Sequence, residues 1–298
     1  MIKNFGELVA RVKKLPNKTI VIAAAHTSSV LEAAVMIKKE NLANALLTGD
    51  QKEIENFLRK NYPGMTDAFK IYDTGTDLEA GAVKAVDLVR EGQADIIMKG
   101  KCETSSLLKA VLDRERGLRT GEIMSDVLAY ETEEKIILMG DGGFVPLPDL
   151  NQKVSIINNC IKVAHSLGNP CPRVALLTHS EKVNPKIQST VDAALITQMS
   201  LRKQIVGCVI DGPLAFDNAV NREAAQLKGI DSPVAGNADV LIVPNIESGN
   251  IFGKALTYYC HYRMAHVAMG ARVPILITSR ADEAETKFLS VALGIISS

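Results

Sequence analysis

The chain has 298 residues and carries 34 Lys and Arg against 34 Asp and Glu, so its formal net charge is zero. This balance, with only 4% aromatic residues and no Trp, argues against nucleic acid as a partner, because the chain lacks both a basic excess and rings that stack on bases. The composition, 47% apolar and 23% charged, is typical of a globular enzyme, and at about this length one core tends to divide into two.

Cysteine and histidine usage excludes two common kinds of site. The five cysteines are odd in number and contain no CxxC pair, and the five histidines contain no HExxH motif, so neither a disulfide framework nor a metal site is expected. The N-terminal residues lack the apolar core of a signal peptide, and no uncharged apolar run reaches the length of a membrane span. We therefore expect a cytoplasmic protein that binds no metal and no membrane.

Apolar runs alternate with amphipathic segments over the first hundred residues. Apolar residues at helical spacing predict a helix from Phe5 to Val12, and the run TIVIAAA that follows predicts a buried strand. The same alternation predicts helices over 30–40, 52–60 and 78–92, and strands over 44–49, 69–72 and 95–100. This order is typical of a parallel sheet flanked by helices.

A second α/β series begins after Gly121. It opens with strands over 126–131 and 135–140, a loop rich in Gly and Pro, and a helix over 151–167. Further strands are predicted over 173–178, 204–210, 239–244 and 274–278, and further helices over 190–199, 221–229, 250–260 and from about residue 282. No flexible linker separates the two series.

Ligands of open parallel sheets bind beyond the carboxyl ends of the strands, so polar residues there are candidates for function. Ser279 and Arg280 follow the run PILIT, and a guanidinium beside a hydroxyl suits an oxyanion. The structural alternative is an ion pair of Arg280 with Asp282, Glu283 or Glu285. Lys99 ends another predicted strand.

Hydroxyls precede the apolar run LLKAVL. The free backbone N–H groups and hydroxyls of Thr104, Ser105 and Ser106 could receive an anion at this helix start, although ordinary capping explains them equally well. Further along, glycines bracket Arg119 in GLRTG, where the backbone could approach a ligand.

Nucleotide-binding motifs are absent. GNIFGKA has three residues between its glycines and Ala after its Lys, which fails the spacing of a phosphate loop, and no GxGxxG follows a predicted strand.

Several longer phrases, in order, resemble the phosphate acetyl/butyryl transferase family, and most closely its butyryl-transferring members. They are MKGKCETSSLLKAVL, GLRTGEIMS, NPKIQSTVDAALITQMS, DGPLAFD, SPVAGNADVLIVPNIESGNIFGK and PILITSRAD. The resemblance covers almost the whole chain. It implies conversion of a short-chain acyl-CoA, butyryl or branched, and inorganic phosphate to acyl phosphate and CoA, by direct attack in a ternary complex. Coenzyme A is then a substrate, and no cofactor is permanently bound.

The resemblance also implies a fold. It implies the two α/β domains of the isocitrate and isopropylmalate dehydrogenases, facing a cleft, in a homodimer or higher homo-oligomer. The first domain is expected to comprise residues 1–120 with 283–298, and the second residues 121–282.

Site residues follow from the matched motifs. The resemblance implies catalytic roles for Ser279 and Arg280. The family's acetyl-transferring branch has an Asp, proposed as the base, where this chain has Thr286, so Glu285 and Asp282 are both candidate bases. The residues expected to bind phosphate or CoA are Lys99, Thr104, Ser105, Lys109, Arg119, Asn245, Asn250 and Lys254. Lys109 replaces an Arg of that branch, and Arg119 is expected to compensate.

Two other functions remain open. One is a metal- and NAD-dependent hydroxy-acid dehydrogenase of the same fold, for which Asp211, Asp217 and Asp239 would have to converge. The other is a non-catalytic CoA-binding relative that has lost its base.

Overall fold

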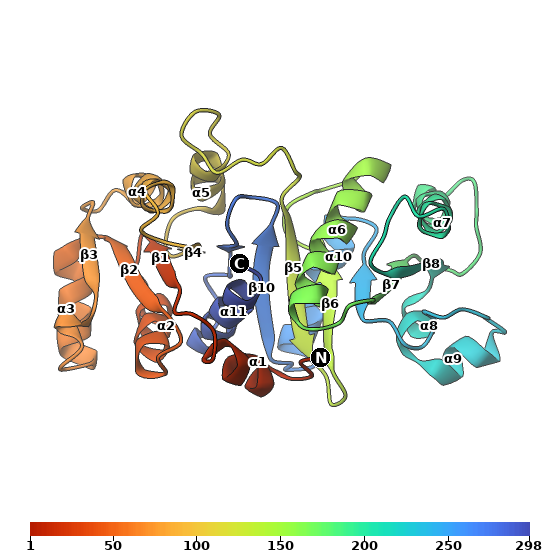
Figure 1. Ribbon diagram of the computed structural model, residues 1–298, viewed down its shortest axis with the longest axis horizontal. Helices are drawn as coiled ribbons and strands as arrows, with labels where there is room; N and C mark the ends of the chain where they lie inside the picture. The colour runs from red at the N-terminus through yellow and green to blue at the C-terminus, as the bar shows by residue number, and fades with distance from the viewer. The chain divides into compact units, whose positions relative to one another are not determined.

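The computed structural model describes residues 1–298, and the chain divides into two compact units. The first unit comprises residues 6–122 and 265–298, and the second unit comprises residues 1–5 and 123–264 (Figure 1). Each unit contains its own run of neighbouring strands with helices on both faces.

The strands of the first unit lie in the order β3-β2-β1-β4-β11-β10. They are β1 (Thr19–Ala23), β2 (Asn44–Gly49), β3 (Lys70–Asp73), β4 (Ile96–Lys99), β10 (Met264–Met269) and β11 (Ile275–Leu276). All neighbours are parallel except β10 and β11. The pairing of β11 with β4 joins the last part of the chain to the N-terminal strands, with Leu276 opposite Met98.

Helices cover both faces of this sheet. They are α1 (Phe5–Val12), α2 (Ser28–Lys39), α3 (Gln51–Asn61), α4 (Leu78–Arg90), α5 (Thr104–Val111) and α11 (Ala284–Ile296), with a 3₁₀ turn at Thr66–Ala68. Figure 1 shows α2 and α11 on one face and α4 and α5 on the other. The residues from Lys287 to Ile295 are all buried, so α11 is enclosed over most of its length.

The strands of the second unit lie in the order β5-β6-β9-β7-β8. They are β5 (Ser125–Glu131), β6 (Ile136–Gly140), β7 (Arg173–Leu177), β8 (Val209–Leu214) and β9 (Val240–Ile242). The hairpin of β5 and β6 is antiparallel, whereas β6, β9, β7 and β8 run parallel.

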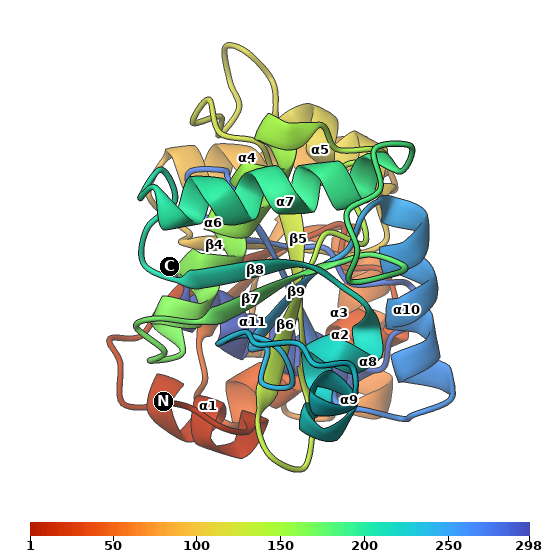
Figure 2. The same ribbon diagram turned by 90° about the vertical axis from the view of Figure 1, so that its right-hand side faces the viewer.

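The helices of the second unit are α6 (Leu150–Ser166), α7 (Gln188–Leu201), α8 (Phe216–Val220), α9 (Arg222–Leu227) and α10 (Ile246–Tyr258). Figure 2 shows α7 on one side of β7 and β8, with α8 and α9 on the other. An apolar core that includes Leu128, Met139, Leu241 and Leu256 ties α10 to the strands. No helix of either unit combines the length and the apolar character needed to cross a membrane.

Most predicted elements are present within a few residues of their expected bounds, but several features differ, among them the short helix α8, which was not predicted. The sheets are mixed and not purely parallel, because β5 and β10 each run against a neighbour. Strand β10 was not predicted, since its short apolar run follows a helix without a clear turn signal. Strand β8 starts at Val209 and not at 204, because Gly207 takes a left-handed conformation with φ +78° and breaks the run.

The observed units also differ from the expected division at 120 and 282. Residues 265–282 belong with the first unit, because β10 pairs with β11 and β11 pairs with β4. Residues 1–5 belong with the second unit, where Ile2 N–H donates to Leu167 O over 2.8 Å.

A buried ion pair joins two helices of the second unit and gives a test of its packing. Lys153 Nζ of α6 lies 2.6 Å from Asp192 Oδ2 of α7, and the two side chains are only 9% and 6% exposed. Lys153→Met should lower the free energy of unfolding by about 3 kcal/mol, because it leaves the buried Asp192 carboxylate without its cation. Urea unfolding measures this loss.

The matched control is Lys228→Met, because the Lys228–Asp217 pair is exposed and contributes at most about 1 kcal/mol. Adding Asp192→Leu to the Lys153 variant should recover most of the loss, since no unpaired charge then remains. Equal losses for the two lysine variants would contradict the assignment.

Candidate functional site

The carboxyl ends of β4 and β11 form the centre of the candidate site in the first unit. These strands are parallel and in register, so the segment that starts at Lys99 lies beside the segment 277–280. Both segments leave the sheet at the same edge, which is the position at which open parallel sheets bind ligands. The two polar loops predicted from separate parts of the sequence are thus neighbours.

A tight turn at residues 279–282 presents Ser279 and Arg280 to solvent. Ser279 N–H donates to Asp282 Oδ2 over 2.7 Å, and Ala281 N–H donates to Ser279 Oγ over 3.3 Å. These bonds fix the turn and use the Ser279 hydroxyl only as an acceptor. Its own proton remains available for a bound anion.

Lys287 supports this turn from below and was not among the predicted site residues. Its side chain is only 2% exposed, and its Nζ donates to Asp282 O over 2.5 Å and to Ser279 O over 3.2 Å. Burial lowers the pKa of Lys287, and the charge of Asp282 partly offsets this effect. The available signal was a single lysine directly before the apolar run FLSVALGII of the last helix.

A second buried ammonium ends β4. Lys99 is 4% exposed, and its Nζ donates to Gly100 O over 3.2 Å. Burial lowers the pKa of Lys99, nearby Cys102 opposes this, and the charge of Arg280 adds to it. Lys99 and Lys287 both bond to backbone carbonyl oxygens, so these bonds do not cancel their positive charge.

Arg280 pairs with a carboxylate that the sequence analysis did not consider. Its Nη2 contacts Glu103 Oε1, instead of Asp282, Glu283 or Glu285. The two side chains are 55% and 67% exposed, so the pair contributes little to stability. Glu103 occupies the N-cap position of α5 without a side-chain cap bond, which leaves the first N–H groups of that helix uncapped by it.

The predicted anion-binding residues separate into near and distant ones. Thr104 and Ser105 begin α5, directly after Glu103 and therefore close to Arg280. Lys109 instead lies in the last turn of α5 and lines a pocket of about 250 Å³ with residues of α4. The backbone of Arg119 forms an isolated antiparallel β-bridge with Ala271, in the connection that precedes β11. Ser279, in contrast, follows β11.

The two candidate bases have different surroundings. Asp282 is half-buried, and one of its carboxylate oxygens already holds the Ser279 N–H. Glu285 is exposed in the first turn of α11. Only Asp282 is thus built into the turn itself.

The remaining predicted residues lie in the second unit, around the start of α10. Asn245 caps this helix through its Oδ1, which accepts from Ser248 N–H over 2.9 Å. Asn250 is exposed, and its Nδ2 donates to Gly142 O over 3.5 Å. Lys254 is exposed on the same helix.

Asp141, which the sequence analysis took as part of a loop, organises the backbone next to α10. Its side chain is 3% exposed, and its carboxylate accepts the backbone N–H groups of Asp126, Gly143, Phe144 and Val145 over 2.8–3.2 Å. The neighbouring Gly142 packs so closely that a Cβ there would lie 3.1 Å from the backbone of Gly249. The GDGG sequence therefore encodes a tight contact with the helix that carries Asn250.

Asp141 also has an unusual titration. Burial raises its pKa to about 6, the charge of Asp126 adds to this, and the backbone N–H donors oppose it. The group is thus ionised at neutral pH but takes up a proton under mildly acidic conditions.

The three aspartates that a dehydrogenase would require do not form a cluster. Asp239 pairs with Lys135 and Arg173, Asp217 pairs with Lys228, and the side chain of Asp211 accepts from Gly212 N–H. Each carboxylate has a different partner. The three aspartates therefore do not converge, and the expectation that a dehydrogenase would require is wrong. No group of three or more His, Cys, Asp or Glu side chains is placed to hold a metal ion.

Comparison with known proteins adds a family match to this geometry. The family model described as Phosphate acetyl/butaryl transferase matches residues 74–295. The matched region includes the strand ends β4 and β11, the loop at Asp141 and the whole of α10.

Individual relatives match over nearly their whole length. A phosphate butyryltransferase of Clostridium beijerinckii is 44% identical over 296 residues, covering 99% of this chain and 97% of that protein. A phosphate acetyltransferase of Thermotoga maritima is 40% identical over 294 residues, with 98% and 99% covered. The crystal structure of a branched-chain phosphotransacylase from Enterococcus faecalis matches with a TM-score of 0.83 and 30% identity, with 94% and 98% covered.

The titration of Asp141 gives a pH-dependent prediction. Its folded-state pKa of about 6 lies above its ordinary value of 3.8, so the native state binds this proton more tightly than the unfolded chain does. This contribution to stability is present at low pH and is lost as the pH rises through about 6. Between about pH 5 and pH 7 it amounts to about 1 kcal/mol.

Urea unfolding of the parent and of Asp141→Asn at these two pH values measures the effect. The difference in unfolding free energy between the two pH values should shrink by about 1 kcal/mol in the variant, because Asn does not titrate. Asp149→Asn is the control, since Asp149 is an exposed cap of α6. An unchanged pH dependence in the Asp141 variant would show that this carboxyl is not the titrating group.

Proposed function

Because the chain belongs to the phosphate acetyl/butyryl transferase family, we propose that it transfers a short acyl group from coenzyme A to inorganic phosphate, releasing CoA and an acyl phosphate. The butyryltransferase and the branched-chain phosphotransacylase among its relatives favour a butyryl or branched acyl group. The observation that carries the proposal is the turn with Ser279 and Arg280, which stands at one strand edge with Lys99 and Lys287.

The reaction places two demands on the site. Phosphate is an anion that must approach a thioester carbonyl, and the carbonyl oxygen becomes negative as the new bond forms. Fixed positive charge and hydrogen-bond donors are therefore needed where that charge develops. Arg280 supplies a planar guanidinium with parallel N–H groups, and the Ser279 hydroxyl supplies another donor.

The buried lysines supply charge that does not depend on a flexible side chain. Lys99 and Lys287 are held by backbone carbonyls at the ends of β4 and at the turn, so their positions are set by the sheet and by α11. Phosphate bound at this edge gains from both charges and from the N-terminal N–H groups of α5.

Phosphate binding requires Arg280 to leave Glu103. Because both side chains are more than half exposed, breaking this ion pair costs less than about 1 kcal/mol. In the free site Glu103 holds the guanidinium next to Thr104 and Ser105. A phosphate oxygen then replaces the Glu103 carboxylate.

Departure of CoA demands little acid assistance, because a thiol has a pKa near about 8.5 and its thiolate is a good leaving group. The reverse reaction needs a base to remove the thiol proton. In this proposal Glu285 is the base. The Asp282 carboxylate positions Ser279 by accepting the Ser279 backbone N–H.

The proposal has further parts that follow from the family. CoA is a substrate and no cofactor is permanently bound, while Asn245, Asn250 and Lys254 contribute to substrate binding from the second unit. The fold is that of the isocitrate and isopropylmalate dehydrogenases, the assembly is a homodimer or higher homo-oligomer, and the protein works in the cytoplasm.

A substrate panel tests the activity itself. CoA release is measured with acetyl-, propionyl-, butyryl-, isobutyryl- and isovaleryl-CoA, with and without phosphate. We expect phosphate-dependent release that is fastest with a four- or five-carbon acyl group. CoA binding without turnover of any of these thioesters would instead identify a non-catalytic relative.

The role of Arg280 gives a sharper prediction. Arg280→Ala should lower kcat by about a hundredfold, because a donor to the developing oxyanion is lost. Arg280→Lys should recover only part of this activity, since Lys keeps the positive charge but lacks the planar, bidentate N–H donors of the guanidinium. Arg272→Ala is the matched control, because Arg272 is exposed and precedes β11, whereas Arg280 follows it. Normal butyryl-CoA turnover by the Arg280 variants would refute the assignment.

The two carboxylates can be separated by the pH dependence of the assay. Glu285→Gln should slow CoA acylation by acyl phosphate and remove the dependence of its rate on an ionising base, because the thiol proton has lost its acceptor; CoA release slows as well, since both directions pass through one transition state. Asp282→Asn should leave that pH dependence in place, since Asp282 acts on the turn and not on the thiol. Equal activity of the Glu285 variant and the parent would exclude Glu285 as the base.

A further inference from the structure

A pocket of about 550 Å³ lies in the second unit. Its walls include the end of antiparallel β5 and the residues that precede β6 and β9, among them Lys135 and Ala238, together with residues of α8 and α10. Lys135 and Ala238 lie at the amino-terminal edge of the parallel strands, whereas Asn245 follows β9 at the carboxyl edge. The residues assigned to acyl transfer in this unit, Asn245, Asn250 and Lys254, do not line the pocket.

Four aromatic side chains from different segments line this pocket: Tyr130 of β5, Phe216 of α8, Phe252 of α10 and Tyr262 after α10. Tyr130 stacks on Tyr262 with ring centroids 5.8 Å apart, and Phe216 meets Phe252 edge to face at 5.0 Å. Tyr130 and Phe252 are also in edge contact at 6.3 Å. The rings thus form one continuous aromatic wall, although the whole chain contains only 4% aromatic residues.

The Tyr130 hydroxyl is a polar group without a partner on this wall. The residue is only 3% exposed, yet its hydroxyl makes no hydrogen bond within the protein. Burial raises the pKa of Tyr130, and nearby Tyr262 and Cys260 add to this, so the phenol remains a donor. The hydroxyl oxygen is not among the fully buried side-chain atoms that lack a partner, so it is accessible to water or to a ligand acceptor.

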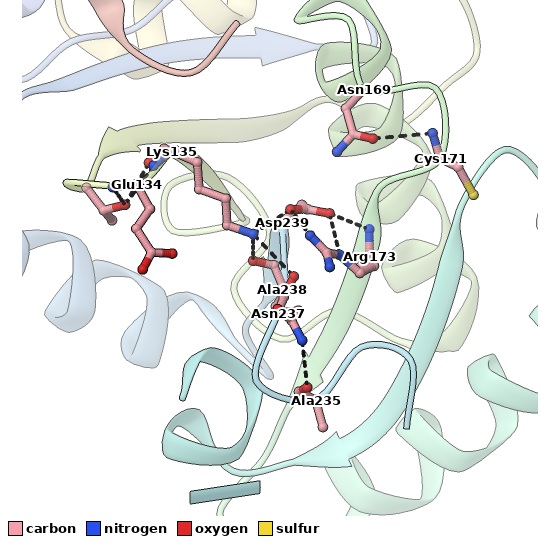
Figure 3. A network of polar contacts seen from close by, with 10 residues as sticks. Glu134, Lys135, Asn169, Cys171, Arg173, Ala235, Asn237, Ala238 and Asp239 are labelled. Atoms are coloured by element: carbon pink, nitrogen blue, oxygen red, sulfur yellow. Dashed lines mark hydrogen bonds and ion pairs between the residues drawn. The ribbon is translucent and has the colours of Figure 1, made fainter. Parts of the chain in front are cut away.

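The charges around the pocket favour a cation. Lys135 is fully occupied, because its Nζ donates to Asn237 O, Ala238 O and Asp239 Oδ1 over 3.2, 2.8 and 2.5 Å (Figure 3). Arg173 also pairs with Asp239. Glu134, in contrast, points away from this network in Figure 3, and its carboxylate has no partner. The exposed Glu133 also lines the pocket, and its carboxylate has no partner either, so two free acids stand at the rim.

We infer that this pocket binds a small organic ammonium ion, with its cationic head against the rings and its polar end at the Tyr130 hydroxyl. Aromatic faces attract cations, and quaternary ammonium groups are recognised in this way. The volume is that of a small-molecule site. CoA and phosphate, the proposed substrates, are anions and do not fit the acidic rim.

Choline and its uncharged isostere 3,3-dimethylbutan-1-ol test the inference directly, because they have the same shape and differ in charge. Each is titrated into the full-length protein, and binding is followed by amide chemical shifts in NMR spectra. Choline should shift resonances of the pocket residues in a saturable manner. The isostere should bind at least about tenfold more weakly, since attraction to the rings and to the acids acts on the charge.

Variants locate the site. Tyr262→Leu should weaken choline binding by about tenfold, because a ring of the wall is lost. The double variant Glu133→Gln with Glu134→Gln alters only exposed positions and should also weaken choline binding, without a change in fold. Tyr259→Leu is the matched control, because Tyr259 is 88% exposed, does not line the pocket, and should leave binding unchanged.

Three results would overturn the inference: no choline binding, equal binding of choline and the isostere, or shifts confined to residues outside the pocket. A pocket covered by a second copy of the chain would give the first of these results. The experiment does not involve acyl-CoA, so its outcome is independent of the acyltransferase proposal.

Discussion

The parallel pairing of β11 with β4 is the constraint on which the candidate site depends. It places Leu276 opposite Met98 and so brings two loops, separated by about 180 residues of sequence, to one strand edge. A shift of β11 by one residue would turn its side chains to the other face of the sheet relative to those of β4. Since β11 has only two residues, α11 must hold it in place, and the buried Lys287 connects that helix to the turn after β11.

Burying Lys99 and Lys287 next to the exposed turn at residues 279–282 costs folding free energy. Burial lowers the pKa of both Lys99 and Lys287, which means that their charged forms are less favourable there than in water. Carbonyl oxygens satisfy the N–H groups but cancel no charge, and the Asp282 carboxylate offsets only part of the effect of burial. In the proposed function, an arriving phosphate relieves the positive potential that remains, so the same feature opposes folding and favours substrate binding.

Sequence patterns predicted most of the helices and strands, because buried strands here are short apolar runs and the helices are amphipathic. They also placed Ser279, Arg280 and Lys99 correctly at strand ends. They did not find Lys287 or Asp141, since the importance of each comes from burial against residues distant in sequence. Lys109 was proposed from the family resemblance and stays a prediction; it lies in the last turn of α5, where it lines a pocket with residues of α4.

The surroundings of the lysines underlie the proposal that the two units bind different ligands. Lys99 and Lys287 bond to neutral carbonyls, so the edge that they occupy keeps its positive charge and suits phosphate. Lys135 of the second unit bonds to Asp239, a carboxylate that it shares with Arg173, so the charge of Lys135 is only partly offset. Glu133 and Glu134 nevertheless outnumber Lys135 among the charged residues that line the aromatic pocket. The sign of each site therefore depends on the balance of all charges around it, and not on the number of lysines alone.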